Sequence, residues 1–101
     1  MVIAARQDAL SRIGRALADP SRQRLLLGLL DGVEYSSDLA DAAGLGRTNT
    51  SNHLTCLREC GLVVAHAEGR RVRYELASPE LAAALRALTE IELVPLTECE
   101  R

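Results

Sequence analysis

The sequence predicts a mainly α-helical domain with one small β-hairpin. Apolar residues recur at helical spacing along most of the chain. Residues 62–67 and 72–76 depart from that spacing and have the pattern of two short strands joined by a Glu-Gly-Arg turn. Phenylalanine and tryptophan are absent although 48% of the residues are hydrophobic, and small aliphatic side chains favour closely packed helices. We assign the 101 residues to a single domain, 1–101, because that length is typical of one domain.

Two helices are expected in the first third of the chain. Apolar spacing predicts the first over residues 6–18, and Asp19 ends it because a residue that precedes proline disfavours the helical conformation. Pro20 suits the first position of the second helix, where its missing N–H is not needed. An Asp-Gly pair at 31–32 ends that helix.

A short helix, a glycine-containing turn and a longer helix come next, which is the order of a helix-turn-helix. Ser36 or Ser37 is expected to cap the short helix, at about 38–43. The longer helix, about 47–60, ends before a glycine, and we call it the recognition helix. The hairpin that follows, about 62–76, makes the predicted fold a winged helix-turn-helix.

A fifth helix, about 79–93, is expected to join two copies of the chain. Ser78 is its expected N-cap and Pro79 its first residue. Its leucines, isoleucine and alanines form an apolar stripe that is wider than a small monomer can cover. We therefore predict a homodimer about a two-fold axis, with residues 94–101 as a mobile tail.

The first turns of the recognition helix are rich in short hydroxyl and amide side chains. Such residues lower helix propensity, whereas a face selected only for solubility usually carries Glu and Lys. Hydroxyl and amide groups contact base edges and phosphates from a helix in the major groove. We therefore predict DNA contacts by five residues of this helix: Arg47, Thr48, Asn49, Ser51 and Asn52.

The hairpin adds a cluster of positive charge. The formal net charge of the chain is −2, so any signal for nucleic acid must be local. Arg70, Arg71 and Arg73 follow the hairpin turn, where a wing would hold phosphate or enter the minor groove. The alternative is ordinary surface charge paired with Glu68 and Glu75.

Cys56 and Cys60 occupy adjacent turns on one side of the recognition helix. Their Cβ atoms are expected roughly 5–6 Å apart, which is too far for an unstrained disulfide, at about 3.5–4.5 Å. A metal ion bound by both sulfurs accepts the wider spacing. Cys99 is the third thiol and comes six residues after Leu93, the predicted end of the fifth helix. Six extended residues span about 20 Å. We therefore predict a site of three thiols, with Cys99 from the same or the other protomer.

Three thiolates without histidine favour a soft ion, namely cadmium, lead or arsenite, over zinc, nickel or cobalt. Two other interpretations stay open. Cys99 would form a disulfide with Cys56 or Cys60 in a redox-sensing repressor. Alternatively, the helical pair packs in the core of a DNA-binding module without a sensing role. The polar surroundings of Cys99 in Thr-Glu-Cys-Glu-Arg favour a ligand role.

Several segments together resemble the ArsR/SmtB family of metal-responsive repressors. The strongest are S-N-H-L at 51–54, L-R-E-C-G-L-V at 57–63 and E-G-R-R-V-R-Y-E-L at 68–76, and the likeness covers nearly the whole chain. The resemblance implies a winged-helix homodimer joined through its first and last helices. It also implies a repressor that binds double-stranded operator DNA and is released by an inducer.

The other sensing sites of that family are absent from this sequence. The segment Y-S-S-D-L-A-D at 35–41 contains no cysteine, and residues 80–93 contain no histidine. Paired cysteines at the end of the recognition helix, with one more in the tail, are similar to the cadmium- and lead-sensing members. That resemblance implies Cys56, Cys60 and Cys99 as ligands of a cadmium or lead ion, with arsenite as the alternative inducer.

The sequence also argues against several other classes of protein. It has no run of 18 apolar residues, so no membrane span is expected. Its first residues lack the apolar core of a signal peptide, and we expect a cytoplasmic protein. His53 and His66 have no acidic partner at catalytic spacing, so we expect neither an enzyme nor an organic cofactor.

Overall fold

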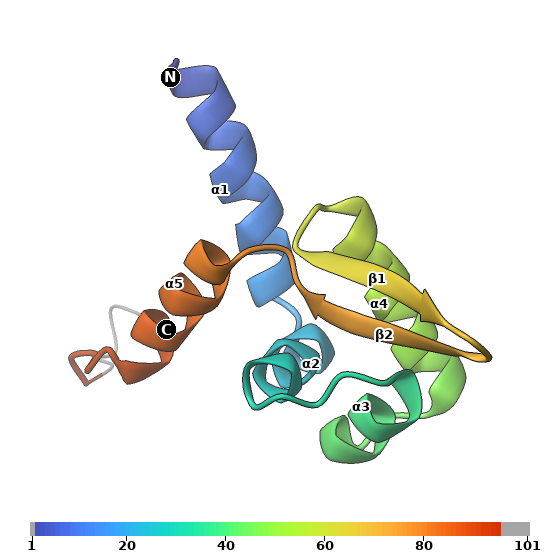
Figure 1. The fold of residues 1–101 in the computed structure, drawn as a ribbon. Helices are drawn as coiled ribbons and strands as arrows, with labels where there is room; N and C mark the ends of the chain where they lie inside the picture. The colour runs from blue at the N-terminus through green and yellow to red at the C-terminus, as the bar shows by residue number, and fades with distance from the viewer. Residues whose placement is uncertain (1, 96–101) are drawn as a thin grey trace.

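The computed structural model describes residues 2–95 of the chain (Figure 1). Four helices come first: α1 (Ile3–Leu17), α2 (Pro20–Leu30), α3 (Ser36–Ala43) and α4 (Arg47–Glu59). The antiparallel strands β1 (Val63–Glu68) and β2 (Arg71–Leu76) follow, and then helix α5 (Pro79–Glu90). The predicted fold class and the predicted order of elements are confirmed.

The core is built around α2, which packs against α1, α3, α4 and β2 (Figure 1). Leu25, Leu39, Leu54 and Leu57 are each at most 1% exposed. Burying one such side chain stabilises the fold by about 1.5–3 kcal/mol. Leucine thus takes the place that aromatic residues hold in many cores, as the composition predicts. The helices also approach closely, because a Cβ added at Gly28 of α2 would lie 3.1 Å from the Leu39 side chain.

Side chains cap the N-termini of two helices: the cap by Ser78 is predicted from the sequence, and the cap by Asp19 is not. The Asp19 carboxylate accepts from the backbone N–H of Arg22 at 2.9 Å, and the Ser78 hydroxyl accepts from that of Leu81 at 3.1 Å. The predicted cap of α3 is wrong, because Ser36 and Ser37 both lie inside that helix. The N-cap is Tyr35, whose extended backbone forms a β-bridge with β2, so the helix begins directly after it.

Two helix boundaries differ from the prediction by three residues. Helix α1 begins at Ile3 rather than residue 6, and α5 ends at Glu90 rather than residue 93. Ile91 is already extended, and Leu93 and Val94 are exposed. The apolar side chains beyond the end of α5 are exposed rather than packed, so packing does not extend that helix. Cys99 lies outside the described residues.

The hairpin is a regular ladder from Val63–Leu76 to Glu68–Arg71. Gly69 makes the turn with a φ of +62°, a conformation that favours glycine. The N–H of Tyr74 in β2 donates to the carbonyl of Glu34 at 2.7 Å, which ties the hairpin to the segment before α3. In Figure 1 the hairpin runs beside α4 and projects past α3, in the position of a wing.

Helix α1 extends away from the other elements at its N-terminal end (Figure 1). Ile3 and Leu10 on this part of the helix are exposed. None of the helices within residues 2–95 is long and apolar enough to cross a membrane.

Candidate nucleic-acid interface and thiol site

Helix α4 has one buried side and one side open to solvent. Thr50, Leu54 and Leu57 face the core. The five residues of this helix that are predicted to contact DNA are all exposed: Arg47, Thr48, Asn49, Ser51 and Asn52. Packing therefore leaves the predicted contact residues free to meet a partner.

Arginines from two elements meet in a surface hollow between the hairpin and the helices. Arg47 at the start of α4 lines it together with Arg70 and Arg71 of the wing, and the hollow has a volume of about 340 Å³. Ser36 and Ser37 also line it. Arginine and hydroxyl groups at such a position suit a phosphate backbone, because phosphate contacts dominate binding to DNA.

Arg71 contacts the N-cap residue of α3, Tyr35, and a residue in the first turn of that helix, Asp38. Its guanidinium stacks on the ring of Tyr35, 3.6 Å from the centroid, and its Nη2 donates to the Asp38 carboxylate at 3.4 Å. A cation over an aromatic face at this distance is an attractive contact. The wing is thereby attached to the helix-turn-helix at the side of the hollow.

Arg73 has a different environment from the other two wing arginines. It donates to the carboxylates of Glu68 at 2.7 Å, Glu34 at 3.1 Å and Glu75 at 3.3 Å. These bonds, the one from Glu68 first, raise the pKa of Arg73 above its usual range. The alternative of pairing with Glu68 and Glu75 thus holds for Arg73, while the DNA contact predicted for it stays a prediction.

A tyrosine completes the same network. The Tyr35 hydroxyl donates to Glu68 at 2.7 Å, and this bond lowers the pKa of Glu68 and raises that of Tyr35. His66 lies 2.6 Å from Glu75, which lowers the pKa of that carboxyl. Nothing in the sequence indicated Tyr35, because its contacts join segments about thirty residues apart.

The two described cysteines share a small cavity where α1, α2 and α4 meet. Cys56 and Cys60 are free, half-buried thiols. Both line a cavity of about 80 Å³, together with Arg15, Arg22 and the side chains of Ala16 and Leu57. Cys60 caps the end of α4, and its N–H donates to the carbonyl of Cys56 at 3.0 Å. The geometric expectation that both thiols lie on one side of the helix is confirmed.

Arg22 is the residue of this site that the sequence did not indicate. Its Nη1 donates to Sγ of Cys56 at 3.5 Å, and its Nη2 donates to the carbonyl of Arg15 at 2.9 Å. Its Nε is buried and has no hydrogen-bond partner among residues 2–95. Arg22 and Cys56 are 34 residues apart in the chain, so only the fold brings them together.

The two thiols fit part of a site for a soft metal ion. Both thiols line one cavity, and no disulfide joins them to each other. Two sulfur donors from adjacent helical turns suit a thiophilic ion, but a closed site needs at least one ligand more. Within residues 2–95 no three His, Cys, Asp or Glu side chains gather as a metal site. The third ligand predicted from the sequence, Cys99, lies beyond that range.

Comparison with known proteins identifies the family. The sequence model described as "Bacterial regulatory protein, arsR family" matches residues 19–64, from the cap of α2 into β1. The HTH-type transcriptional regulator CmtR of Mycobacterium tuberculosis is 58% identical over 93 residues, which is 92% of this chain and 79% of CmtR. The chain belongs to the ArsR family. It is therefore a transcriptional regulator and not an enzyme.

Solved structures of two similar proteins have the same fold. The NMR structure of the cadmium metal-sensor CmtR from M. tuberculosis matches with a TM-score of 0.70, covering 87% of this chain and 92% of that one. The homodimeric winged helix-turn-helix DNA-binding domain of Mb0332 from Mycobacterium bovis matches with a TM-score of 0.77 at 33% identity, covering 85% of this chain and 80% of the other. The family resemblance seen in the sequence is thus confirmed.

Proposed function

We propose that this ArsR-family chain represses transcription as a homodimer on operator DNA and is released by a cadmium or lead ion. Cys56, Cys60 and Cys99 bind the ion, and Cys99 comes from either protomer. The observation that carries the proposal is the pair of free thiols in one cavity at the end of the recognition helix. The likeness to CmtR, whose structure is described as that of a cadmium metal-sensor, supports the choice of ion.

The placement of the thiols supports a link between ion binding and DNA affinity. Cys56 and Cys60 are on α4, whose exposed residues are the proposed base and phosphate contacts. Three thiols that bind a divalent ion and release their protons to water form a complex of net charge −1 at the end of this helix. A shift of α4, together with negative charge near phosphate, lowers the affinity for DNA. A coupling of this kind typically changes affinity about 5–150-fold.

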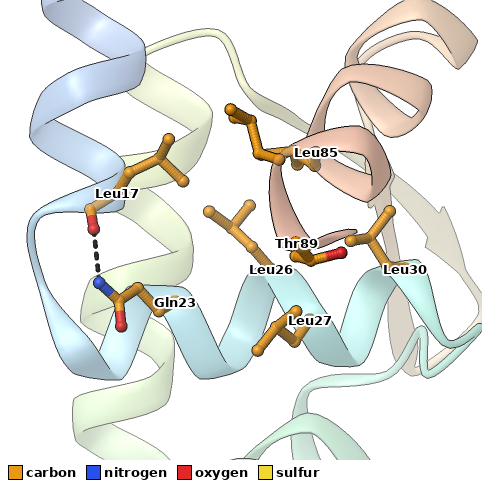
Figure 2. A pocket seen from close by; sticks show the side chains of 8 residues that line it. Leu17, Gln23, Leu26, Leu27, Leu30, Leu85 and Thr89 are labelled. Carbon is orange, nitrogen blue, oxygen red and sulfur yellow. Dashed lines mark hydrogen bonds between the residues drawn. The ribbon is translucent and has the colours of Figure 1, made fainter. Parts of the chain in front are cut away.

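The proposed dimer surface is the apolar side of α1 and α5. Figure 2 shows Leu17, Leu26 and Leu85 pointing from three helices into a hollow, whose volume is about 220 Å³. Leu27 of α2 and Leu88 of α5 are exposed and line it. Other exposed apolar side chains lie on α1, at Ile3 and Leu10, and beyond the end of α5, at Ile91 and Leu93. A patch of this kind usually marks an interface. We assign it to a second copy, since the similar Mb0332 domain is homodimeric.

The test is a cadmium titration of the complex between this protein and an operator duplex, selected from a random library with the metal-free protein. Fluorescence anisotropy should show a fall in affinity within the range given above. Single Cys56→Ser, Cys60→Ser and Cys99→Ser variants should bind the duplex as the wild type does and lose the response to cadmium. Unchanged affinity at saturating metal would contradict the proposal.

Titrations of the wild type and the cysteine variants distinguish between the candidate inducers. Thiolate-to-metal charge-transfer absorbance in titrations with cadmium, lead and arsenite reports which ion binds and how many thiols take part. A redox sensor would instead release DNA with peroxide in the absence of metal, and a non-reducing gel would show a disulfide to Cys99.

A further inference from the structure

We infer that Tyr35, the N-cap residue of α3, positions the wing arginines for contact with DNA phosphate. Tyr35 is a positioning residue and does not itself touch the DNA. The inference rests on the proposed function, because it concerns how the wing meets operator DNA. It goes further by giving a role to a residue that lies outside both the recognition helix and the wing.

The outer end of the hairpin needs support from outside the sheet. A hairpin of two strands is at best marginally stable alone in water. Backbone contacts hold its middle, since Tyr35 forms a β-bridge with Arg73 and the N–H of Tyr74 donates to the carbonyl of Glu34. The turn lies beyond these contacts, at the end of the wing that projects past α3 (Figure 1). Arg70 is part of that turn.

The Tyr35 side chain holds both residues of the last ladder pair before the turn, Glu68 and Arg71. Its hydroxyl donates to Oε1 of Glu68 at 2.7 Å, and its ring lies against the guanidinium of Arg71, 3.6 Å from the centroid. The other carboxylate oxygen of Glu68 accepts from Nε of Arg73 at 2.7 Å, so both oxygens are held. One side chain outside the wing therefore fixes both strands where they enter the turn.

A second contact between α3 and this end of the wing is weaker. Arg71 donates to the Asp38 carboxylate at 3.4 Å, but the two side chains are 56% and 60% exposed. Exposed ion pairs contribute little, because solvent screens them and long side chains lose freedom in forming them. Tyr35 is half-buried and its hydroxyl bond is much shorter. We therefore assign the support of the turn to Tyr35.

Arg70 and Arg71 are the groups that this support orients. Both line the hollow beside α4, and among residues 2–95 no ion pair involves Arg70. An arginine on an unsupported turn samples many orientations, and restricting them on binding lowers affinity. A turn held by Tyr35 keeps both guanidiniums beside the hollow, where the phosphate contacts are proposed.

The experiment measures affinity for the selected operator duplex at several salt concentrations, by fluorescence anisotropy on the metal-free full chain. Tyr35→Leu removes both contacts and keeps an apolar side chain, whereas Tyr35→Phe removes only the hydroxyl. We expect Tyr35→Leu to reduce the slope of log affinity against log salt by about 1 for each arginine that loses its phosphate. Tyr35→Phe should reduce it less, because the ring still stacks on Arg71. In a chain that carries both Arg70→Ala and Arg71→Ala, Tyr35→Leu should change neither the affinity nor the slope.

The outcomes separate this inference from the proposed function. A wild type that binds no duplex would remove the proposed function itself. A wild type that binds, together with a folded Tyr35→Leu variant of unchanged affinity and slope, would overturn the role of Tyr35 alone. An equal loss with and without the two wing arginines would also overturn it, because Tyr35 would then contact the DNA directly. If circular dichroism shows that Tyr35→Leu is unfolded, Tyr35→Phe, which keeps the ring, gives the same comparison in both backgrounds.

Discussion

At the scale of single residues, the carboxylates of the wing give the fold a dependence on pH. Hydrogen bonds hold the pKa values of two of them below their ordinary value of 4.5. The bond with Tyr35 is the largest cause for Glu68, and the bond with His66 is the largest cause for Glu75. A carboxyl with a lowered pKa in the folded state stabilises the fold above its unfolded pKa. That stabilisation is lost as the pH falls through the folded pKa, so it weakens below about pH 4.5.

We therefore expect the free energy of unfolding in urea to fall as the pH drops from about 5 to about 3. Glu68→Gln should make this fall shallower, because the variant has no carboxylate to protonate at that position. Glu59→Gln, at an exposed position at the end of α4, is the control and should follow the wild type. Equal pH dependence in all three proteins would contradict the role given to Glu68.

At the scale of elements, α5 depends on its N-cap residue, Ser78. The Ser78 hydroxyl is the side-chain cap of the helix, bonded to the N–H of Leu81 at 3.1 Å. Ser78→Ala should lower the free energy of unfolding by about 1 kcal/mol, measured by chemical denaturation. Ser78→Asp, which keeps a hydrogen-bond acceptor at the cap, should retain most of the stability of the wild type. An equal loss in both variants would show that the cap bond does not stabilise the helix.

The wing arginines should differ in what they do. Arg70 is exposed at the turn and lines the hollow beside α4, whereas Arg73 is held by three carboxylates. Arg70→Ala should weaken binding to all duplexes alike and reduce the slope of log affinity against log salt by about 1. Arg73→Ala should instead destabilise the hairpin. Arg6→Ala, on the exposed part of α1, should leave the salt slope unchanged.

At the scale of the whole molecule, the proposed dimer needs the apolar surface of α1 and α5. Leu88 on α5 is 50% exposed and lines the hollow of Figure 2. Leu88→Glu would bury a charge at the interface, and we expect sedimentation to show a shift toward monomer with weaker operator binding. Val64→Glu, which places the same charge on the exposed side of the hairpin, should remain a dimer. A dimer of unchanged stability in Leu88→Glu would place the interface elsewhere.

Much of the fold follows from local signals in the sequence. Pro20 at a helix start, Gly44 at the turn with a φ of +66° and Ser78 at a cap are each determined by the conformation of a few neighbouring residues. The error at Ser36 has the opposite cause. A serine before a helix has the pattern of a cap, but a β-bridge from Tyr35 to a strand far along the chain sets where the helix begins.

The sequence by itself determined the helix-turn-helix, the wing and the exposed polar side of α4, because periodicity and turn residues act over short distances. It also placed Cys56 and Cys60 on one side of a helix, since a spacing of four residues fixes that. Only the tertiary structure decided that Arg22 contacts the thiol of Cys56 and that Arg73 also contacts Glu34. Both depend on contacts between segments whose separation leaves no periodic trace in the chain.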